Sequence, residues 1–130
     1  MVEHGSVHWN ELMTRDVEAA KRFYAETLGW DFQAMPMEEG TYWIIQSGET
    51  LVGGLMEISE ERGFPADAPV QWMTYIAVDD IDKRLEAVAA AGGQVLRPPF
   101  DVPMVGRIAM ISDASGCVAG WITPAPSQQG

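Results

Sequence analysis

One carboxylate among large apolar residues is the feature of this sequence best suited to chemistry. Glu11 lies in the segment 7–13, which reads as a β-strand, and strand residues alternate between two faces. Glu11 therefore shares a face with Trp9 and Met13. Burial beside such neighbours would raise the pKa of the carboxyl group and suit it to proton transfer. Glu11 is thus a candidate general acid or base.

Other readings of Glu11 and its neighbours stay open. The carboxylate could lie at a rim or pair with an arginine such as Arg107 or Arg97. His8 and Glu11 look like a pair of metal ligands, but three residues apart on a strand they point to opposite faces. A bulge or a slip of one residue in register would be needed to join them. Cys117 follows a turn glycine with no histidine beside it in the pattern, and we expect a small packed residue rather than a nucleophile.

The segment around Glu11 has a counterpart in the second half of the chain. Asp16 is placed to accept a backbone N–H at the start of a helix, and Asp80 holds the same place after the strand 71–78. Such a repeat, with four strands and one helix in each half, indicates an internal duplication. The aligned pairs are Trp9 with Met73, Glu11 with Tyr75, and Gly54 with Gly120.

The elements of each unit follow from apolar periodicity and from turn residues. The first unit, about 6–58, is expected to contain a helix over 17–28 ended by Gly29, a short strand at 30–32, a loop at 35–40, and strands at 42–46 and 51–58. Residues 59–69 read as a linker. The second unit, about 70–123, is expected to contain a helix over 81–92, a short strand at 94–97 stopped by Pro98 and Pro99, and strands at 107–112 and 118–123. Residues 124–130 read as a frayed tail.

This order predicts an α+β fold in one domain spanning residues 1–130. Two βαβββ units would pair their curved sheets around a central cup, and a concave, mostly apolar enclosure is the usual ligand site. An α+β sandwich with a filled core is the alternative. Tyr75 could donate a hydrogen bond to a ligand carbonyl and is the second catalytic candidate. The expected ligand-binding residues are Trp9, Met13, Trp43 (or its neighbour Tyr42), Gly54, Met73 and Gly120.

Composition limits the partners and the location. Nineteen acidic and eight basic residues give a net charge of −11, which repels phosphate backbones and anionic lipid, so neither nucleic acid nor a membrane is expected to bind. A cationic ligand stays possible. A single cysteine and the lack of a long apolar run predict a cytoplasmic protein. Exposed sheet edges favour a homodimer.

Two stretches of the sequence resemble the vicinal oxygen chelate superfamily, which includes glyoxalase I, bleomycin resistance proteins and extradiol dioxygenases. The first runs from Glu11 to Trp30, and the second from Trp72 through Asp80, Gly92-Gly93 and 99–107 to 113–116. The likeness covers nearly the whole chain and is strongest to the branch labelled glyoxalase-like or hydroxylase-like. One difference is Ala114, where many relatives have proline after the aspartate.

The resemblance also implies where a metal would bind. Metal-dependent relatives take a His, Glu or Gln ligand from the first and fourth strands of each unit. The matching positions here are approximately Trp9, Gly54, Met73 and Gly120. Indole and glycine offer no side-chain lone pair, and a thioether is a poor ligand for a hard divalent ion. We therefore expect no metal and no other cofactor, unless the strand register is wrong.

Three functions follow from the resemblance and the residues. The favoured one is binding of an unknown small, planar or apolar molecule in a metal-free cup, as bleomycin resistance proteins sequester a ligand. The second is a metal-free enzyme in which Glu11 acts as general acid and base. The third is a metal-dependent lyase, isomerase or dioxygenase of the glyoxalase type, which would require a different register.

Overall fold

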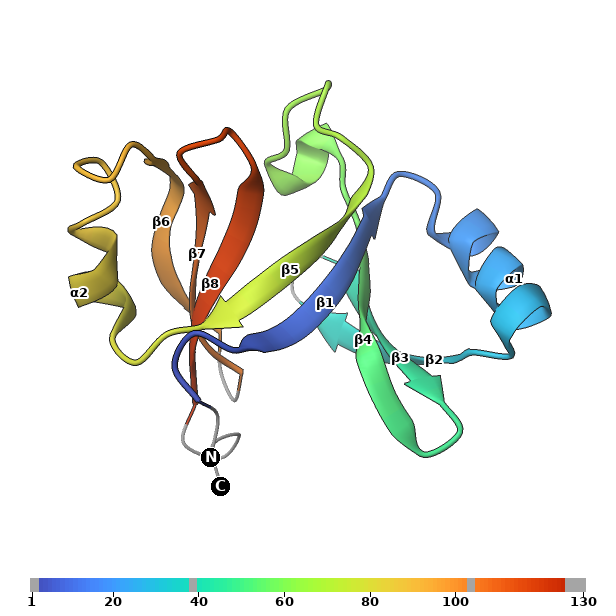
Figure 1. Cartoon of the computed structure of the whole chain (residues 1–130). Helices are drawn as coiled ribbons and strands as arrows, with labels where there is room; N and C mark the ends of the chain where they lie inside the picture. The colour runs from blue at the N-terminus through green and yellow to red at the C-terminus, as the bar shows by residue number, and fades with distance from the viewer. Residues whose placement is uncertain (1–2, 38–39, 103–104, 126–130) are drawn as a thin grey trace. The chain divides into compact units, whose positions relative to one another are not determined.

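The computed structural model describes residues 3–37, 40–102 and 105–125. The chain forms two compact units (Figure 1). One spans Trp9–Trp72, and the other combines the residues from Met73 onward with the N-terminal residues up to His8. Within the described residues, each unit contains four strands and one α-helix in the order β-α-β-β-β. The prediction of an α+β fold built from two βαβββ units is therefore confirmed.

The unit of residues 9–72 has the strand order β2-β3-β4-β1. Its elements are β1 (Val7–Thr14), α1 (Val17–Leu28), β2 (Asp31–Met37), β3 (Gly40–Ser47) and β4 (Thr50–Glu57). The pair β1–β4 is parallel and the other two pairs are antiparallel. Asp16 accepts a hydrogen bond of 3.0 Å from the backbone N–H of Ala19, and Gly29 ends α1 at φ 73°. Both predicted ends of α1 are thus confirmed.

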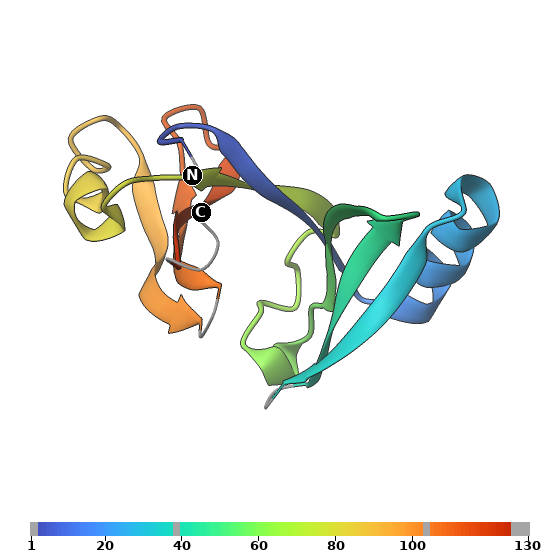
Figure 2. The ribbon, with the colours of Figure 1, turned by 90° about the horizontal axis from the view of Figure 1, so that it is seen from below.

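The core of this unit lies between its strands and α1. Leu12, Ile45 and Leu55 are buried there, and α1 contributes partly buried apolar residues from its inner face. Figure 1 and Figure 2 show α1 on one side of these strands. Because neighbouring residues of β1 point to opposite faces, the burial of Leu12 beneath α1 directs Glu11 to the other face, which we call the helix-free face.

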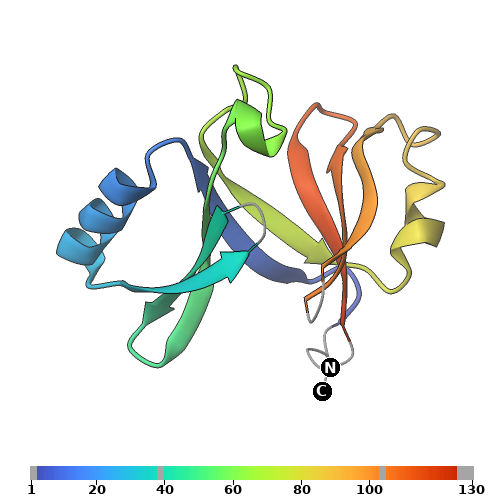
Figure 3. The ribbon, with the colours of Figure 1, turned by 180° about the vertical axis from the view of Figure 1, so that it is seen from behind.

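The connection from β4 to β5 includes the short 3₁₀ turn η1 (Glu60–Arg62), drawn in green near the top of Figure 3. Arg15 fastens this connection, because its Nη2 donates hydrogen bonds to the carbonyl oxygens of Ala66 and Ala68 at 2.9 and 2.6 Å. The stretch predicted as a linker is therefore tied to the end of β1.

The other unit has the order β5-β8-β7-β6, formed by β5 (Gln71–Ala77), β6 (Gln94–Val102), β7 (Gly106–Ser112) and β8 (Val118–Pro124), with the helix α2 (Ile81–Leu85). The pair β5–β8 is parallel, like β1–β4. Val78, Ile81 and Ala109 are buried beside α2. The N-terminal residues join this unit through hydrogen bonds from Gly5 N to Ala77 O (2.7 Å) and from Ala77 N to Ser6 O (2.8 Å).

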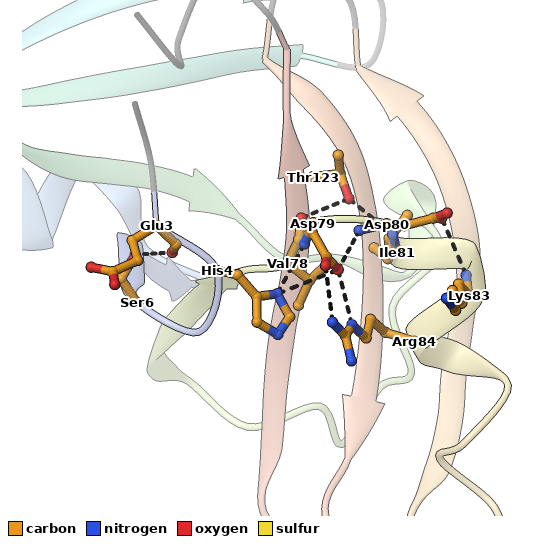
Figure 4. Close-up of polar contacts among 10 residues, drawn as sticks. All are labelled: Glu3, His4, Ser6, Val78, Asp79, Asp80, Ile81, Lys83, Arg84 and Thr123. Atoms are coloured by element: carbon orange, nitrogen blue, oxygen red, sulfur yellow. Dashed lines mark hydrogen bonds and ion pairs between the residues drawn. The ribbon is translucent and has the colours of Figure 1, made fainter.

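Side-chain hydrogen bonds fix the start of α2 (Figure 4). Asp80 accepts from the backbone N–H of Lys83 at 3.2 Å, as predicted for a capping residue. Arg84 donates two hydrogen bonds of 2.9 Å to the carboxylate of Asp79. These bonds hold the pKa of Asp79 well below its usual range. His4 Nδ1 accepts a hydrogen bond of 3.0 Å from the Asp79 backbone N–H, which secures the N-terminal segment.

Two strands continue through prolines that were predicted to lie outside them. β2 runs past Pro36 to Met37, and β6 runs through Pro98 and Pro99 with shifts in register between Val95 and Phe100. The predicted loop 35–40 is therefore wrong for residues 35–37 and 40, which lie in strands, while residues 38–39 lie outside the described part. The predicted stop at Pro98-Pro99 is also wrong. The reason is position: β2 and β6 each have one neighbour within their unit, and an outer strand tolerates a residue that lacks an N–H.

The helix predicted over 81–92 is shorter than expected. The α-helix ends at Leu85, and bonds between residues three apart follow, such as Val88 N to Leu85 O at 3.2 Å. Beyond Leu85, Val88 is the one buried residue of this stretch, so little apolar packing supports a longer helix. Pro124, predicted to begin the frayed tail, belongs to β8, while residues 126–130 lie outside the described part.

Candidate functional site

A chain of hydrogen bonds connects three side chains in the unit of residues 9–72. The indole Nε1–H of Trp9 donates to the hydroxyl oxygen of Tyr42 at 2.9 Å, and that hydroxyl donates to Oε2 of Glu11 at 2.8 Å. The directions are consistent, because a phenol can accept one bond and donate another. The arrangement links a carboxylate to an indole through one ordered hydroxyl.

Glu11 is buried, with 6% of its surface exposed, whereas Trp9 and Tyr42 are half-buried. Met13 lies two residues further along β1 on the same face and is also buried. A carboxylate so enclosed is stabilised only if its oxygen atoms find partners, and Tyr42 supplies one. The expected sharing of a face by Trp9, Glu11 and Met13 agrees with these contacts.

Gly54 leaves room for Tyr42 on the helix-free face. It pairs with Glu11 on β1 and with Ile44 on β3. A Cβ atom built on Gly54 would overlap the hydroxyl oxygen of Tyr42. The phenol therefore occupies the space that a side chain at position 54 would need.

The other unit repeats this arrangement with different residues. Tyr75 pairs with Gly120, just as Glu11 pairs with Gly54. A Cβ atom built on Gly120 would overlap the ring of Tyr75, which is 4% exposed. Met73, two residues before Tyr75 on β5, is likewise buried.

The four positions at which metal-dependent relatives carry ligands do not suit a divalent ion here. They hold Trp9, Gly54, Met73 and Gly120, and none of these residues offers an oxygen or imidazole nitrogen ligand. Tyrosine rings fill the space beside both glycines. Across residues 3–37, 40–102 and 105–125, no three His, Cys, Asp or Glu side chains gather closely enough to hold a metal.

Trp43 points to the face opposite Glu11. Its ring packs with the core beneath α1, and the Nζ atom of Lys21 lies 3.4 Å from the ring centroid. Tyr42, the alternative considered in the sequence analysis, is the residue that contacts Glu11. Placing Trp43 on the inward face is thus a correction. Trp43 also lines a shallow cleft of about 350 Å³ beside the start of α1, together with Arg15 and Arg62.

The sequence pattern alone could not choose between these two aromatic residues. Both stand in the run Thr41-Tyr42-Trp43-Ile44, whose members suit either face of a half-buried strand. The deciding signal is the register, since Ile44 pairs with Gly54 and Trp43 with Leu55. Arg107, once a possible partner of Glu11, instead donates hydrogen bonds to Asp82 and Asp101.

The chain belongs to the Glyoxalase/Bleomycin resistance protein/Dioxygenase superfamily, whose sequence profile matches residues 6–119. This confirms the resemblance on which the family prediction was based. Solved structures agree: methylmalonyl-CoA epimerase from Mycobacterium tuberculosis superposes with a TM-score of 0.64 at 18% identity, covering 98% of this chain and 95% of that one. A hypothetical protein from Bacillus halodurans gives 0.68 at 16% identity, covering 95% and 96%. The TM-scores establish a common fold, and at identities this low the likeness shows the fold alone.

Sequence relatives are closer. The chain is 39% identical over 127 residues to "Putative glyoxylase CFP32" of Mycobacterium tuberculosis and 30% identical over 132 residues to "Anthracycline biosynthesis protein DnrV" of Streptomyces peucetius. These alignments cover 97% and 90% of this chain but 47% and 46% of the relatives, so the chain spans about half of their length. A "Glyoxylase-like domain-containing protein" of Didymella fabae is 32% identical, with 89% of this chain and 91% of that protein covered.

None of the helices in the described ranges is both long enough and apolar enough to cross a lipid bilayer.

Proposed function

We propose that this member of the superfamily binds a planar, carbonyl-bearing small molecule on the helix-free face of residues 9–72, without a divalent metal. The observation that carries the proposal is the hydrogen-bonded chain from Trp9 through Tyr42 to Glu11. It combines a half-buried indole with an ordered hydroxyl and a buried carboxylate, and small-molecule sites are typically apolar surfaces with a few well-placed polar groups. The single cup formed by both units stays a prediction.

The chemistry of this face favours a flat ligand. An indole offers a large, rigid surface on which an aromatic ring can stack. The relative named for anthracycline biosynthesis, 30% identical to this chain, supports a polycyclic aromatic compound in particular. A net charge of −11 further favours a ligand that carries a positive group.

The first experiment uses daunorubicin, an anthracycline with a planar carbonyl-bearing ring system and a cationic amine, as a fluorescent probe. We expect saturable binding that Trp9→Leu weakens by about tenfold, because the stacking surface is lost. Trp72→Leu is the matched control, because it also removes one partly exposed indole, and its Kd should stay within about twofold. If Trp9→Leu and Trp72→Leu bind equally well, the helix-free face is not the site.

A second candidate function is proton transfer by Glu11, and the burial of this carboxylate favours it. The carboxylate would take a proton from a carbon next to the ligand carbonyl: the C–H bond breaks, an O–H bond forms on Glu11, and the electron pair moves to the carbonyl oxygen. Return of the proton to that carbon restores the carbonyl group and regenerates the carboxylate. Tyr42 would keep Oε2 in place, which makes it a positioning residue.

Deuterium exchange separates binding from catalysis. For a carbonyl compound that binds, we expect NMR to show exchange of the proton next to the carbonyl in D2O, and Glu11→Gln to abolish this exchange while leaving Kd within about threefold. Equal exchange in the wild type and in Glu11→Gln would exclude Glu11 as the base. A variant that loses binding and exchange together would assign Glu11 to the ligand site instead.

A further inference from the structure

Aromatic residues gather beside α1, partly on its core-facing side and partly at the surface. Phe23 is 57% exposed and Trp72 is 40% exposed, and both rings contact Tyr24, with centroids 5.1 and 6.0 Å away. Leu28, one helical turn after Tyr24, is 55% exposed. Trp30 completes the group by stacking on Tyr24 at 4.9 Å. We call these five residues the α1 aromatic patch.

The patch is held rigid from within the unit. Tyr24 and Trp30 pack against the buried core of Leu12, Ile45 and Leu55, while Trp30 also contacts Trp72 edge to face at 6.0 Å. Aromatic side chains fixed in this way lose little conformational freedom on binding, and tryptophan and tyrosine are the residues most enriched at the energetic centres of protein interfaces. The patch therefore has the composition of an interface centre.

The charge of α1 differs from that of the whole chain. The chain carries a net charge of −11, but α1 has two acidic and two basic residues, Glu18 and Glu26 against Lys21 and Arg22. Lys21 is engaged with Glu18 and with the ring of Trp43. Arg22 and Glu26 are exposed and lie four residues apart beside Phe23. The surface of α1 therefore carries equal numbers of positive and negative side chains. The acidic remainder of the chain, by contrast, repels the same acidic surface of a second copy.

We propose that the α1 aromatic patch is a self-association surface, at which two copies of this chain pair through antiparallel α1 helices. Two-fold symmetry brings the same residues together from both sides. In that arrangement Phe23 and Trp72 pack on their counterparts, and Arg22 of each copy meets Glu26 of the other. A strongly basic partner would be attracted to the acidic remainder of the chain rather than to this neutral surface.

The α1 aromatic patch replaces the sheet edge as the expected dimer contact. The outer strands β2 and β6 contain Pro36, Pro98 and Pro99. A proline on an outer strand removes a backbone donor and obstructs pairing with a further strand. The outer strands are therefore poorly suited to joining two copies, whereas α1 presents a surface without this obstacle.

Analytical ultracentrifugation tests the surface directly. We expect the wild type to form dimers at concentrations up to roughly 100 μM, and Phe23→Ser and Trp72→Ser each to raise the dimer Kd by about tenfold or more. Leu51→Ser is the matched control, because Leu51 is 53% exposed at the start of β4, and its dimer Kd should equal that of the wild type. Circular dichroism melts establish that each variant is folded. A monomeric wild type, or a dimer unaffected by Phe23→Ser, would overturn the proposal.

A charge exchange tests the pairing itself. Arg22→Glu and Glu26→Arg should each weaken the dimer, since each creates two like-charge contacts across the two-fold axis. The double variant restores opposite charges between copies and should return the Kd to within about threefold of the wild type. If the double variant dimerises no better than the single variants, the antiparallel pairing is wrong.

Discussion

In each unit a tyrosine lies over the glycine that pairs with the unit's first strand. The strand that carries this tyrosine differs between the two units. In residues 9–72 it is Tyr42, reaching Gly54 from β3. In the other unit it is Tyr75 itself, the neighbour of Gly120 on β5. The equivalent rows are Glu11, Gly54, Ile44 and Gln33 in the first unit and Tyr75, Gly120, Met110 and Arg97 in the second.

This difference has a chemical consequence. Because Tyr42 reaches Gly54 from another strand, the first-strand position is left to the carboxylate of Glu11, and the phenol can donate to it. In the other unit Tyr75 takes the first-strand position as well as the space beside its glycine. The same backbone therefore supports a polar pair in one half and a packed aromatic ring in the other.

The largest effect is expected where the tyrosine cannot move. Gly120→Ala places a methyl group against the Cδ1 and Cε1 atoms of the Tyr75 ring, and the ring is buried. We expect a loss of about 3 kcal/mol in the free energy of unfolding, as for overpacked cores. Urea denaturation measures it. A loss below about 1 kcal/mol would show that Tyr75 does not fill this space.

Gly54→Ala should cost less, about 1–2 kcal/mol, because its methyl group meets the tip of the half-buried Tyr42 side chain, which can turn away. Turning away breaks the bond to Glu11, so ligand binding should suffer more than stability. The same denaturation curves, with daunorubicin titration beside them, measure both. A larger loss of stability for Gly54→Ala than for Gly120→Ala would reverse the comparison.

Tyr42→Phe removes the shared hydroxyl and keeps the ring over Gly54. A buried carboxylate that loses a donor typically costs about 1–2 kcal/mol, so a loss in the free energy of unfolding of this size is expected. The loss should be smaller when Glu11 is already Gln, because a neutral amide has less need of the donor. A double-mutant cycle with Glu11→Gln measures this coupling. Additive losses would mean that the two groups act independently.

The smallest effect concerns the residue before each helix cap. Arg15 binds backbone carbonyls in one unit, whereas Asp79 pairs with Arg84 in the other. The pKa of Asp79 is lowered on folding, so its contribution is present above the unfolded value of about 4 and fades as pH falls below it. Asp79→Asn should therefore lower the urea midpoint slightly at pH 7, and the difference should shrink in acid. An undiminished difference in acid would contradict this assignment.

Local signals in the sequence predicted one helix and the repeat well. The capping residue Asp16 and the glycine at position 29 define α1 correctly, and the alternation of β1 places Glu11 opposite Leu12. Strand ends at prolines were misjudged, because tolerance of Pro36 depends on β2 being an outer strand. That is a property of the assembled sheet, which no local pattern carries.

The candidate site was predictable only in part, because some of its contacts also depend on the assembled sheet. The face of Glu11 follows from β1 alone, but its partner Tyr42 depends on the register between β3 and β4. Which side chains fill the space beside Gly54 and Gly120 also depends on tertiary structure. The sequence repeat, which aligns the two glycines, indicated only that these positions correspond.

Metal analysis of the purified protein tests the central proposal most directly, namely that no divalent metal binds where Trp9, Met73 and two glycines stand at the ligand positions of this superfamily. After purification without chelators and incubation with Zn²⁺, Mn²⁺, Fe²⁺ and Ni²⁺ followed by desalting, we expect no divalent ion to remain in stoichiometric amount. One tightly held ion per chain, lost in Glu11→Gln but retained in Asp79→Asn, would contradict the account.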